Sequence, residues 1–254
     1  MKRTLLITAL SALVTLPSLA AVSLVHYYEL GENMVSNRPQ DSAGSLHFSG
    51  GKLGATSSSS PSPISGSYST FNGTNDGVYG TSLAAFATNN FIVELWVIAA
   101  NTTQTVNLLH TSGADNGSLK IGIQGGNWSS SYHGISWIGA AGGAGQAVTA
   151  GTWTHLAVIR DSGTSTLYID GVAQAGNTTG TPAHNGPTAF HLGVNPNGGV
   201  GNWFTGGIDD LKLSTFDPNT DDPVAALSIN AVPEPSSTAL LGLGGLALLL
   251  RRRR

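Results

Sequence analysis

Apolar and polar residues alternate in short segments along most of the chain, and turn-forming residues close each segment. The strongest segment, at 91–98, is apolar everywhere except Glu94, so both of its faces are expected to be covered. Residues 152–173 form the clearest hairpin, with a first strand at 153–159, a return strand at 165–169 and a second tight turn at Asp170 and Gly171. Further strands are predicted at 25–30, 77–79, 105–110, 118–123, 134–138, 190–192 and 205–214. Since no long period of 3.6 residues occurs between 21 and 222, the pattern predicts an all-β, two-sheet antiparallel sandwich or jelly roll.

The N-terminus departs from this pattern. Lys2 and Arg3 precede an apolar run at 5–16, and small residues follow up to Ala20. This order is typical of a secretory signal peptide, which we assign to residues 1–20. A retained N-terminal anchor is the alternative, although the run is short for a membrane span.

The C-terminus carries a proline-rich motif, an apolar run at 238–250 and a terminal block of arginines. The run is too short to cross a bilayer comfortably, and the arginines would remain on the cytoplasmic side. This tail resembles a PEP-CTERM protein-sorting signal. The resemblance implies processing by an exosortase-type enzyme after transient or permanent anchoring in the inner membrane; an ordinary membrane anchor is the alternative. The residues that carry it are Val232, Pro233, Glu234, Pro235, Arg251, Arg252, Arg253 and Arg254.

Each of these two ends is expected to be a short hydrophobic helix. Between the signal peptide and the sorting segment at 232–254, we expect a domain at 21–216 and a linker at 217–231. The ends hold six of the eleven basic residues, so the body between them is acidic. This charge argues against a nucleic-acid partner. The chain contains no cysteine, which excludes a disulfide framework, thiol catalysis and cysteine-ligated metals.

Several segments of the body resemble a laminin-G-like domain of the concanavalin A-like lectin/glucanase superfamily. The most specific is the Trp-x-His-Leu-Ala hairpin at 153–157, which ends in Tyr-x-Asp-Gly at 168–171. The other matching segments are 28–32, 71–78, 91–97 and 204–211. The resemblance implies a jelly roll with one concave face. It leaves the function open, because this fold carries binding domains, hydrolases and spacers.

The body lacks the acidic pattern of a glycosidase. Retaining glycosidases need two carboxylates about 5–5.5 Å apart, which a strand supplies from positions two or four residues apart. Glu94 stands alone on its strand, and the adjacent residues Asp209 and Asp210 must point to opposite faces. His155 lies within the hairpin and is expected to be a structural histidine. We therefore predict that the domain is not an enzyme.

Two kinds of ligand remain as hypotheses. Calcium prefers oxygen ligands, and Asp76 and Asp209 are candidates, since Asp209 is expected to lean inward beside Leu211. The alternative is that both carboxylates accept backbone hydrogen bonds. Polysaccharide would contact aromatic faces in regions rich in Gly, Asn and Ser, for which the candidates are Trp128, Tyr132, Trp137 and Trp203. The alternative is that these rings close the ends of the sandwich.

The main hypothesis is an exported, surface-sorted, non-catalytic domain that binds polysaccharide or an extracellular matrix protein. The first alternative is a matrix spacer without a specific ligand. The second is a polysaccharide hydrolase or lyase with an unfamiliar site.

Overall fold

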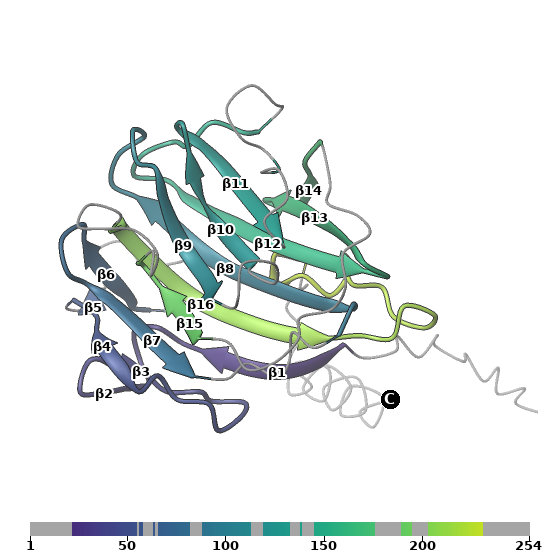
Figure 1. The fold of residues 1–254 in the computed structure, drawn as a ribbon, viewed down its shortest axis with the longest axis horizontal. Coiled ribbons are helices and arrows are strands. Elements are labelled where there is room, and N and C mark those ends of the chain that lie inside the picture. The colour runs from purple at the N-terminus through teal and green to yellow at the C-terminus, as the bar shows by residue number, and fades with distance from the viewer. Residues whose placement is uncertain are drawn as a thin grey trace, which may run out of the picture.

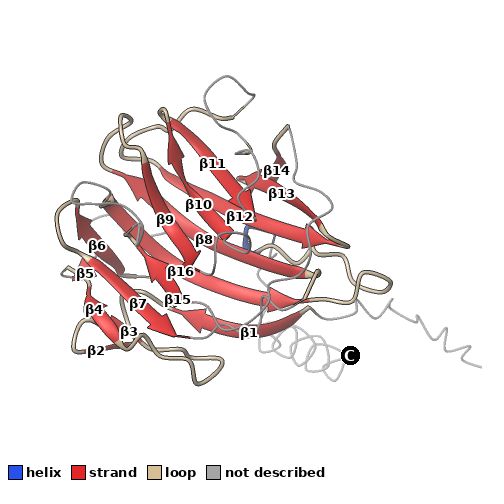
Figure 2. Cartoon of the chain, viewed as in Figure 1, coloured by secondary structure: helices blue, strands red, loops and turns tan. Residues whose placement is uncertain are grey.

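The computed structural model is built almost entirely from β-strands (Figures 1 and 2). It describes residues 22–54, 56–57, 63, 66–81, 88–112, 119–132, 138, 145–175, 189–194 and 203–230. The predicted terminal helices and, except for Ile138, the predicted strand at 134–138 lie outside these residues. Within them the only helical element is a short 3-10 helix, η2 (Ser228–Asn230), and no helix is long and apolar enough to span a membrane.

The larger sheet has eight strands in the order β14-β13-β12-β8-β16-β6-β5, and β1 pairs with the second half of β16. Neighbouring strands in this sheet run antiparallel. Its strands are β1 (Ser23–Tyr28), β5 (Thr56–Ser57), β6 (Tyr68–Asn72), β8 (Phe91–Ala99), β12 (Trp153–Asp161), β13 (Thr164–Ile169), β14 (Val172–Ala173) and β16 (Thr205–Thr215).

The smaller sheet has six antiparallel strands in the order β11-β10-β9-β15-β7-β4. Its strands are β4 (Gly50–Lys52), β7 (Gly77–Thr81), β9 (Val106–Ser112), β10 (Leu119–Gln124), β11 (Asn127–Tyr132) and β15 (Ala189–Leu192). A separate ribbon pairs β2 (Met34–Val35) with β3 (Arg38–Pro39).

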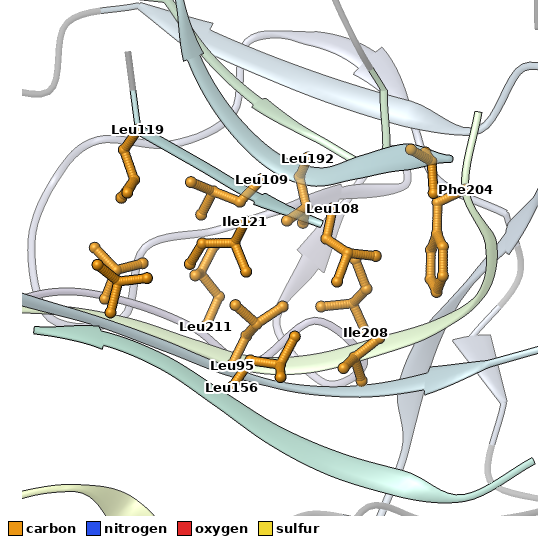
Figure 3. Close-up of a cluster of buried hydrophobic side chains, with 14 of the residues drawn as sticks. Leu95, Leu108, Leu109, Leu119, Ile121, Leu156, Leu192, Phe204, Ile208 and Leu211 are labelled. Carbon is orange, nitrogen blue, oxygen red and sulfur yellow. The ribbon is translucent and has the colours of Figure 1, made fainter. Parts of the chain in front are cut away.

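The core lies between the two sheets, as Figure 3 shows. Alternate residues of each strand enter it, so Leu95 on β8 and Leu156 on β12 face Leu109 and Ile121 on the smaller sheet. Burial of such side chains stabilises the fold by about 1.5–3 kcal/mol each. The two-sheet prediction is confirmed, and each sheet keeps one face that points away from the core.

Two tight turns fix the predicted hairpin. Ser162 and Gly163 join β12 to β13, and Asp170 and Gly171 join β13 to β14, all four with positive φ angles. Positive φ at both central residues matches the right-handed twist of the strands. The first strand runs two residues past the predicted end, because the fully buried Arg160 still points inward toward Ser165 and the Tyr132 ring.

A β-bulge in β16 changes which residues face the core. Asp209 pairs with Trp96, but Lys212 is the next residue in register with β8, and Asp210 between them has a φ of 47°. One extra residue reverses the alternation, so Leu211 points into the core while Asp209 shares the outward face with Trp96. The predicted inward lean of Asp209 is therefore wrong.

Candidate functional site

A row of polar and aromatic residues crosses the outward face of the six-stranded sheet. The strands are in register there, and the row alternates with the core row that holds Leu109 and Leu192. In sheet order its members are Ser131, Lys120, His110, His191, Tyr79 and Gly50. We call these six residues the outward row.

Tyr79 and Gly50 build a flat aromatic platform at one end of this row. The two residues are opposite each other, and a Cβ atom at position 50 would overlap the Tyr79 ring. The ring therefore lies on the bare backbone of Gly50, and the residue is 48% exposed. His191 lies beside it, with ring centroids 5.9 Å apart. Such a platform offers a face on which a sugar ring can stack.

His110 is the most unusual member of the outward row. It is 1% exposed, and neither of its ring nitrogens has a hydrogen-bond partner among the described residues. Its ring centroid is 6.4 Å from that of His191. Burial, together with the charges of Lys120 and His191, lowers the pKa of His110 to about 4. Burial also lowers the pKa of His191, so both imidazoles are neutral at pH 7.

The six-stranded sheet carries no acidic side chain in its described strands. None of β4, β7, β9, β10, β11 and β15 contains an aspartate or a glutamate. Of the outward row, Tyr79 is exposed and Lys120 and His191 are half-buried, whereas Ser131 and His110 are buried. Strand residues on this face cannot supply the pair of carboxylates that glycoside hydrolysis uses.

The opposite sheet holds Glu94, one of its acidic residues, in a buried network. Glu94 is 5% exposed, and its Oε2 atom is 2.9 Å from Nε2 of His155. Ser228 donates its backbone N–H and its hydroxyl to the same carboxylate, at 2.9 and 2.8 Å. Lys212 Nζ donates to the Ser228 hydroxyl at 2.8 Å. We call these four residues the Glu94 network.

The Glu94 network keeps the carboxylate ionised. Burial acts to raise the pKa of Glu94, but the hydrogen bond and charge of His155 and the two bonds from Ser228 outweigh it and lower the pKa below its usual range. A general acid in a glycosidase needs the opposite, a raised pKa. The contacts of His155 agree with the structural role expected from the sequence.

The chain after β16 covers this outward face. Residues 217–230, here called the C-terminal segment, place Leu227 in a second apolar cluster with Ile92, Ala157 and Ile159. Leu227 is fully buried, and Val224 and Ile229 pack beside it. The sequence analysis assigns this stretch to a linker because of its prolines and acidic residues. Its apolar residues dock it on the sheet instead.

Three of the four aromatic residues predicted to bind ligand lie among the described residues, and they do not form one exposed surface. Trp128 and Tyr132 are fully buried on β11, because residues four apart on a strand share one face, here the core face. Trp203 is half-buried and forms an isolated bridge with Val194. Trp137 lies outside the described residues. We therefore do not carry these four residues into the proposed site.

The two predicted calcium ligands accept backbone hydrogen bonds. The Asp76 carboxylate accepts from the N–H of Asn72 at 3.0 Å, and that of Asp209 accepts from the N–H of Asp210 at 3.0 Å. Within the described ranges, no three His, Asp or Glu side chains gather as a metal site. A calcium ion at Asp76 would therefore depend largely on backbone carbonyl oxygens, which this cation accepts as ligands.

A pocket of about 310 Å³ opens on the eight-stranded sheet, away from the outward row. Its lining includes Tyr68, Ile98 and Gly207, and the Tyr68 ring meets Trp153 edge to face at 5.1 Å. Gly207 must lack a side chain, because a Cβ atom there would lie 2.5 Å from the Tyr68 ring. The pocket is mainly apolar and offers fewer polar groups to a sugar than the outward row does.

The outward row is not predictable from the sequence pattern of single strands. Alternation in 118–123 does place Lys120 opposite to Leu119 and Ile121. However, β9 and β15 are about eighty residues apart in the chain, and only their pairing puts His110 beside His191. A pattern within one strand does not reveal such a neighbour.

Comparisons with known proteins identify two regions of the chain. The family model of the concanavalin A-like lectin/glucanases superfamily matches residues 72–221. The model of the PEP-CTERM protein-sorting motif matches residues 231–254, which lie outside the described residues. Among curated proteins no match is found.

Solved structures share the fold at low sequence identity. Domain 4 of an extracellular arabinanase from Geobacillus stearothermophilus, in complex with arabinotriose, is 24% identical with a TM-score of 0.60; the match covers 78% of this chain and 96% of that domain. A Trypanosoma rangeli sialidase in complex with 2,3-difluorosialic acid is 16% identical with a TM-score of 0.57. The match covers 82% of this chain and 32% of the sialidase. Botulinum neurotoxin type C, whose cell entry depends on two ganglioside molecules, is 12% identical with a TM-score of 0.56. The match covers 82% of this chain and 51% of the toxin chain. The chain thus spans about a third of the sialidase and half of the toxin chain.

Proposed function

Because the chain belongs to the concanavalin A-like lectin/glucanase superfamily and carries a PEP-CTERM protein-sorting motif, we propose that it is an exported, non-catalytic domain that binds polysaccharide on its outward row. Both resemblances predicted from the sequence are confirmed. The sorting motif indicates export across the inner membrane and processing to the cell surface or extracellular space. The proposal concerns what the exported domain does there.

The Tyr79 platform is the observation that carries the proposal. An aromatic ring that is 48% exposed and rests on glycine backbone is held flat, so it loses little freedom when a sugar ring stacks on it. His191 beside the ring can exchange hydrogen bonds with sugar hydroxyls. The carbohydrate complex of the arabinanase domain agrees with such a role for this fold.

The placement of acidic groups supports binding without cleavage. The six strands that carry the outward row contain no acidic residue, and Glu94 on the other sheet is hydrogen-bonded on both carboxylate oxygens. Hydrolysis of a glycosidic bond by the common mechanism needs two carboxylates on either side of the bond. The described strand residues of this face carry no carboxylate.

Affinity electrophoresis in gels that contain neutral or acidic polysaccharides tests the binding. We expect retardation by at least one polysaccharide, and a roughly tenfold weaker affinity for Tyr79→Ala, as for a lost aromatic contact. Leu24→Ala is the matched control, because Leu24 is 47% exposed on the opposite sheet. No retardation in any gel contradicts the proposal and favours the matrix spacer.

An assay for reducing ends released from the same polysaccharides tests the non-catalytic part. We expect no release by the purified protein. Release that disappears in Glu94→Gln contradicts this part and favours the hydrolase.

Calcium is proposed as an accessory ligand at the β6–β7 turn, held by Asp76 and neighbouring carbonyl oxygens. The measurement is the melting temperature with calcium and with a chelator. We expect calcium to raise it in the wild type and not in Asp76→Asn; equal melting temperatures contradict a site there.

The proposed processing partner is an exosortase-type enzyme that acts near Pro233. Mass spectrometry of protein from the native host is expected to show a C-terminus close to this motif. An intact arginine block contradicts processing.

A further inference from the structure

A second aromatic residue borders the face that carries Tyr79. Gly77 and Tyr79 lie two residues apart on β7, and Val78 between them is buried in the core, so both positions face outward. A Cβ atom at position 77 would lie 3.0 Å from the Cζ3 atom of Trp203. The Trp203 indole therefore lies against the bare backbone of Gly77, on the same face as the Tyr79 ring.

Local pairing of the chain holds Trp203 in this place. Trp203 forms an antiparallel bridge with Val194, which also contacts position 77. The next residue, Phe204, is fully buried in the core and donates its N–H to the carbonyl of Gly193 at 3.1 Å. Because neighbouring residues of an extended chain point to opposite faces, the burial of Phe204 turns Trp203 outward. Trp203 is half-buried, so part of its surface is open to solvent.

Glycine backbone supports both rings in the same way. A side chain at position 50 would overlap the Tyr79 ring, and one at position 77 would press against Trp203. A ring that is packed on backbone is already restricted before a ligand arrives, so it loses less freedom on binding. The two supported positions of β7 are about 7 Å apart, which is twice the rise per residue of a strand.

This spacing indicates a ligand with more than one sugar ring. A sugar ring stacked on Tyr79 occupies that platform, and the next ring of the same polymer can reach Trp203. Two weak contacts made by one molecule reinforce each other, because the second contact becomes intramolecular. Both contacts use accessible surface, since Tyr79 is 48% exposed and Trp203 is half-buried.

We propose that Trp203 is a second sugar contact, so that a polysaccharide lies along β7 with neighbouring sugar rings on Tyr79 and Trp203. This inference rests on the proposed function. It adds a binding residue, the direction of the polymer and the class of ligand, an oligosaccharide or polymer instead of a single sugar. In the alternative, Trp203 only closes this end of the sandwich, and its removal alters stability without altering the preference for longer ligands.

Oligosaccharide length tests the inference with the purified protein. The probes are arabinan, xylan and dextran, each compared with its monosaccharide and with oligosaccharides of increasing length by calorimetric titration. For at least one of these series, we expect affinity to rise roughly fivefold or more once the oligosaccharide spans both rings, the effect of one added aromatic contact.

Substitution of the ring assigns this gain in affinity. Trp203→Ala is expected to remove the gain and to leave monosaccharide binding unchanged, whereas Tyr79→Ala weakens both. Trp153→Ala is the matched control, because Trp153 is also half-buried but lies on the eight-stranded sheet. This control should keep the gain.

Substitution of the supporting glycine moves the indole without removing it. In Gly77→Ala the new methyl group would lie 3.0 Å from Trp203 and 2.9 Å from Val194, so both side chains must shift, and we expect a smaller gain. Gly80→Ala is the control on the same strand, because its methyl group would meet its neighbours at an ordinary distance of 3.8 Å. Melting temperatures check that each variant is folded.

The outcomes separate this inference from the proposed function. Equal affinity for monosaccharides and oligosaccharides overturns the inference and leaves polysaccharide binding intact. A full gain in folded Trp203→Ala also overturns it; if that variant does not fold, a full gain in Gly77→Ala does so. Absence of binding to every probe contradicts both.

Discussion

The outward faces of the two sheets differ in how they are covered. On the eight-stranded sheet, the C-terminal segment covers apolar residues, and Ser228 satisfies the carboxylate of Glu94. On the six-stranded sheet, the outward row leaves an exposed Tyr79 ring and a His110 imidazole without a partner among the described residues. The first face is completed by the chain itself. The second leaves an aromatic ring exposed to solvent.

This difference separates polar groups that stabilise from polar groups that recognise. A buried carboxylate with several donors contributes to folding and is costly to disturb. A buried imidazole with no donor or acceptor nearby costs stability. Mutations on the two faces should therefore have opposite balances of stability and binding.

Removal of the Glu94 carboxylate should have the largest effect. Glu94→Ala leaves His155 and Ser228 without their buried partner, and we expect a loss of about 4 kcal/mol in the free energy of unfolding. Chemical denaturation measures it. A loss below about 1 kcal/mol would show that the network contributes no more than a surface pair.

Truncation of Leu227 should have the next largest effect. Leu227→Ala opens a cavity between the C-terminal segment and the sheet, with an expected loss of about 3 kcal/mol. Val224→Ala, at a partly buried position of the same segment, should cost less. If both are within about 0.5 kcal/mol of the wild type, the segment is a free linker in solution.

Loss of the Tyr79 ring should alter binding and leave stability almost unchanged. Tyr79→Ala is expected to weaken polysaccharide binding by about 1–1.5 kcal/mol, measured by calorimetric titration. The free energy of unfolding should change by less than about 0.5 kcal/mol, as for other exposed positions. A large loss of stability would place Tyr79 among the structural residues.

A change in pH from 7 to 5 should act mainly on the six-stranded sheet. Burial lowers the pKa of His110 to about 4 and also lowers the pKa of His191, so the unfolded chain takes up protons at a higher pH than the folded chain does. Stability should therefore fall as pH falls through the unfolded histidine pKa of about 6.5. Chemical denaturation at both pH values measures this loss, and equal stability would contradict buried neutral imidazoles.

The buried carboxylates should lose stability only at lower pH. Hydrogen bonds from His26 and from backbone N–H groups outweigh burial and lower the pKa of Asp41, as His155 and Ser228 do for Glu94. A carboxylate with a lowered pKa contributes stability above the unfolded pKa and loses it as pH falls through the folded pKa. This further loss should therefore begin below about pH 4, near the unfolded pKa values of the carboxylates.

Much of the fold is predictable because its signals are local. The alternation in 91–98 and 153–169 identifies β8, β12 and β13, and the Asp170-Gly171 turn follows from residue type. β11 is missed because its sequence, Asn-Trp-Ser-Ser-Ser-Tyr, is polar at four of its six positions and resembles a loop. The four-residue spacing of Trp128 and Tyr132 is the signal that could have placed both rings in the core.

The site is less predictable because it depends on distant pairing. The bulge at Asp210 reverses the face of Asp209, and no local pattern indicates that extra residue. The outward row requires five strand pairings to be known at once. Likewise, the docking of Leu227 depends on an apolar surface formed by β8 and β12.

The docking of Ser228 and Leu227 fixes where the described chain ends on the sandwich. Residues 231 and 232 alone separate Asn230, the end of η2, from Pro233, a distance of at most roughly 11 Å. The sorting motif is therefore tied closely to the eight-stranded sheet, on the side of the sandwich away from Tyr79.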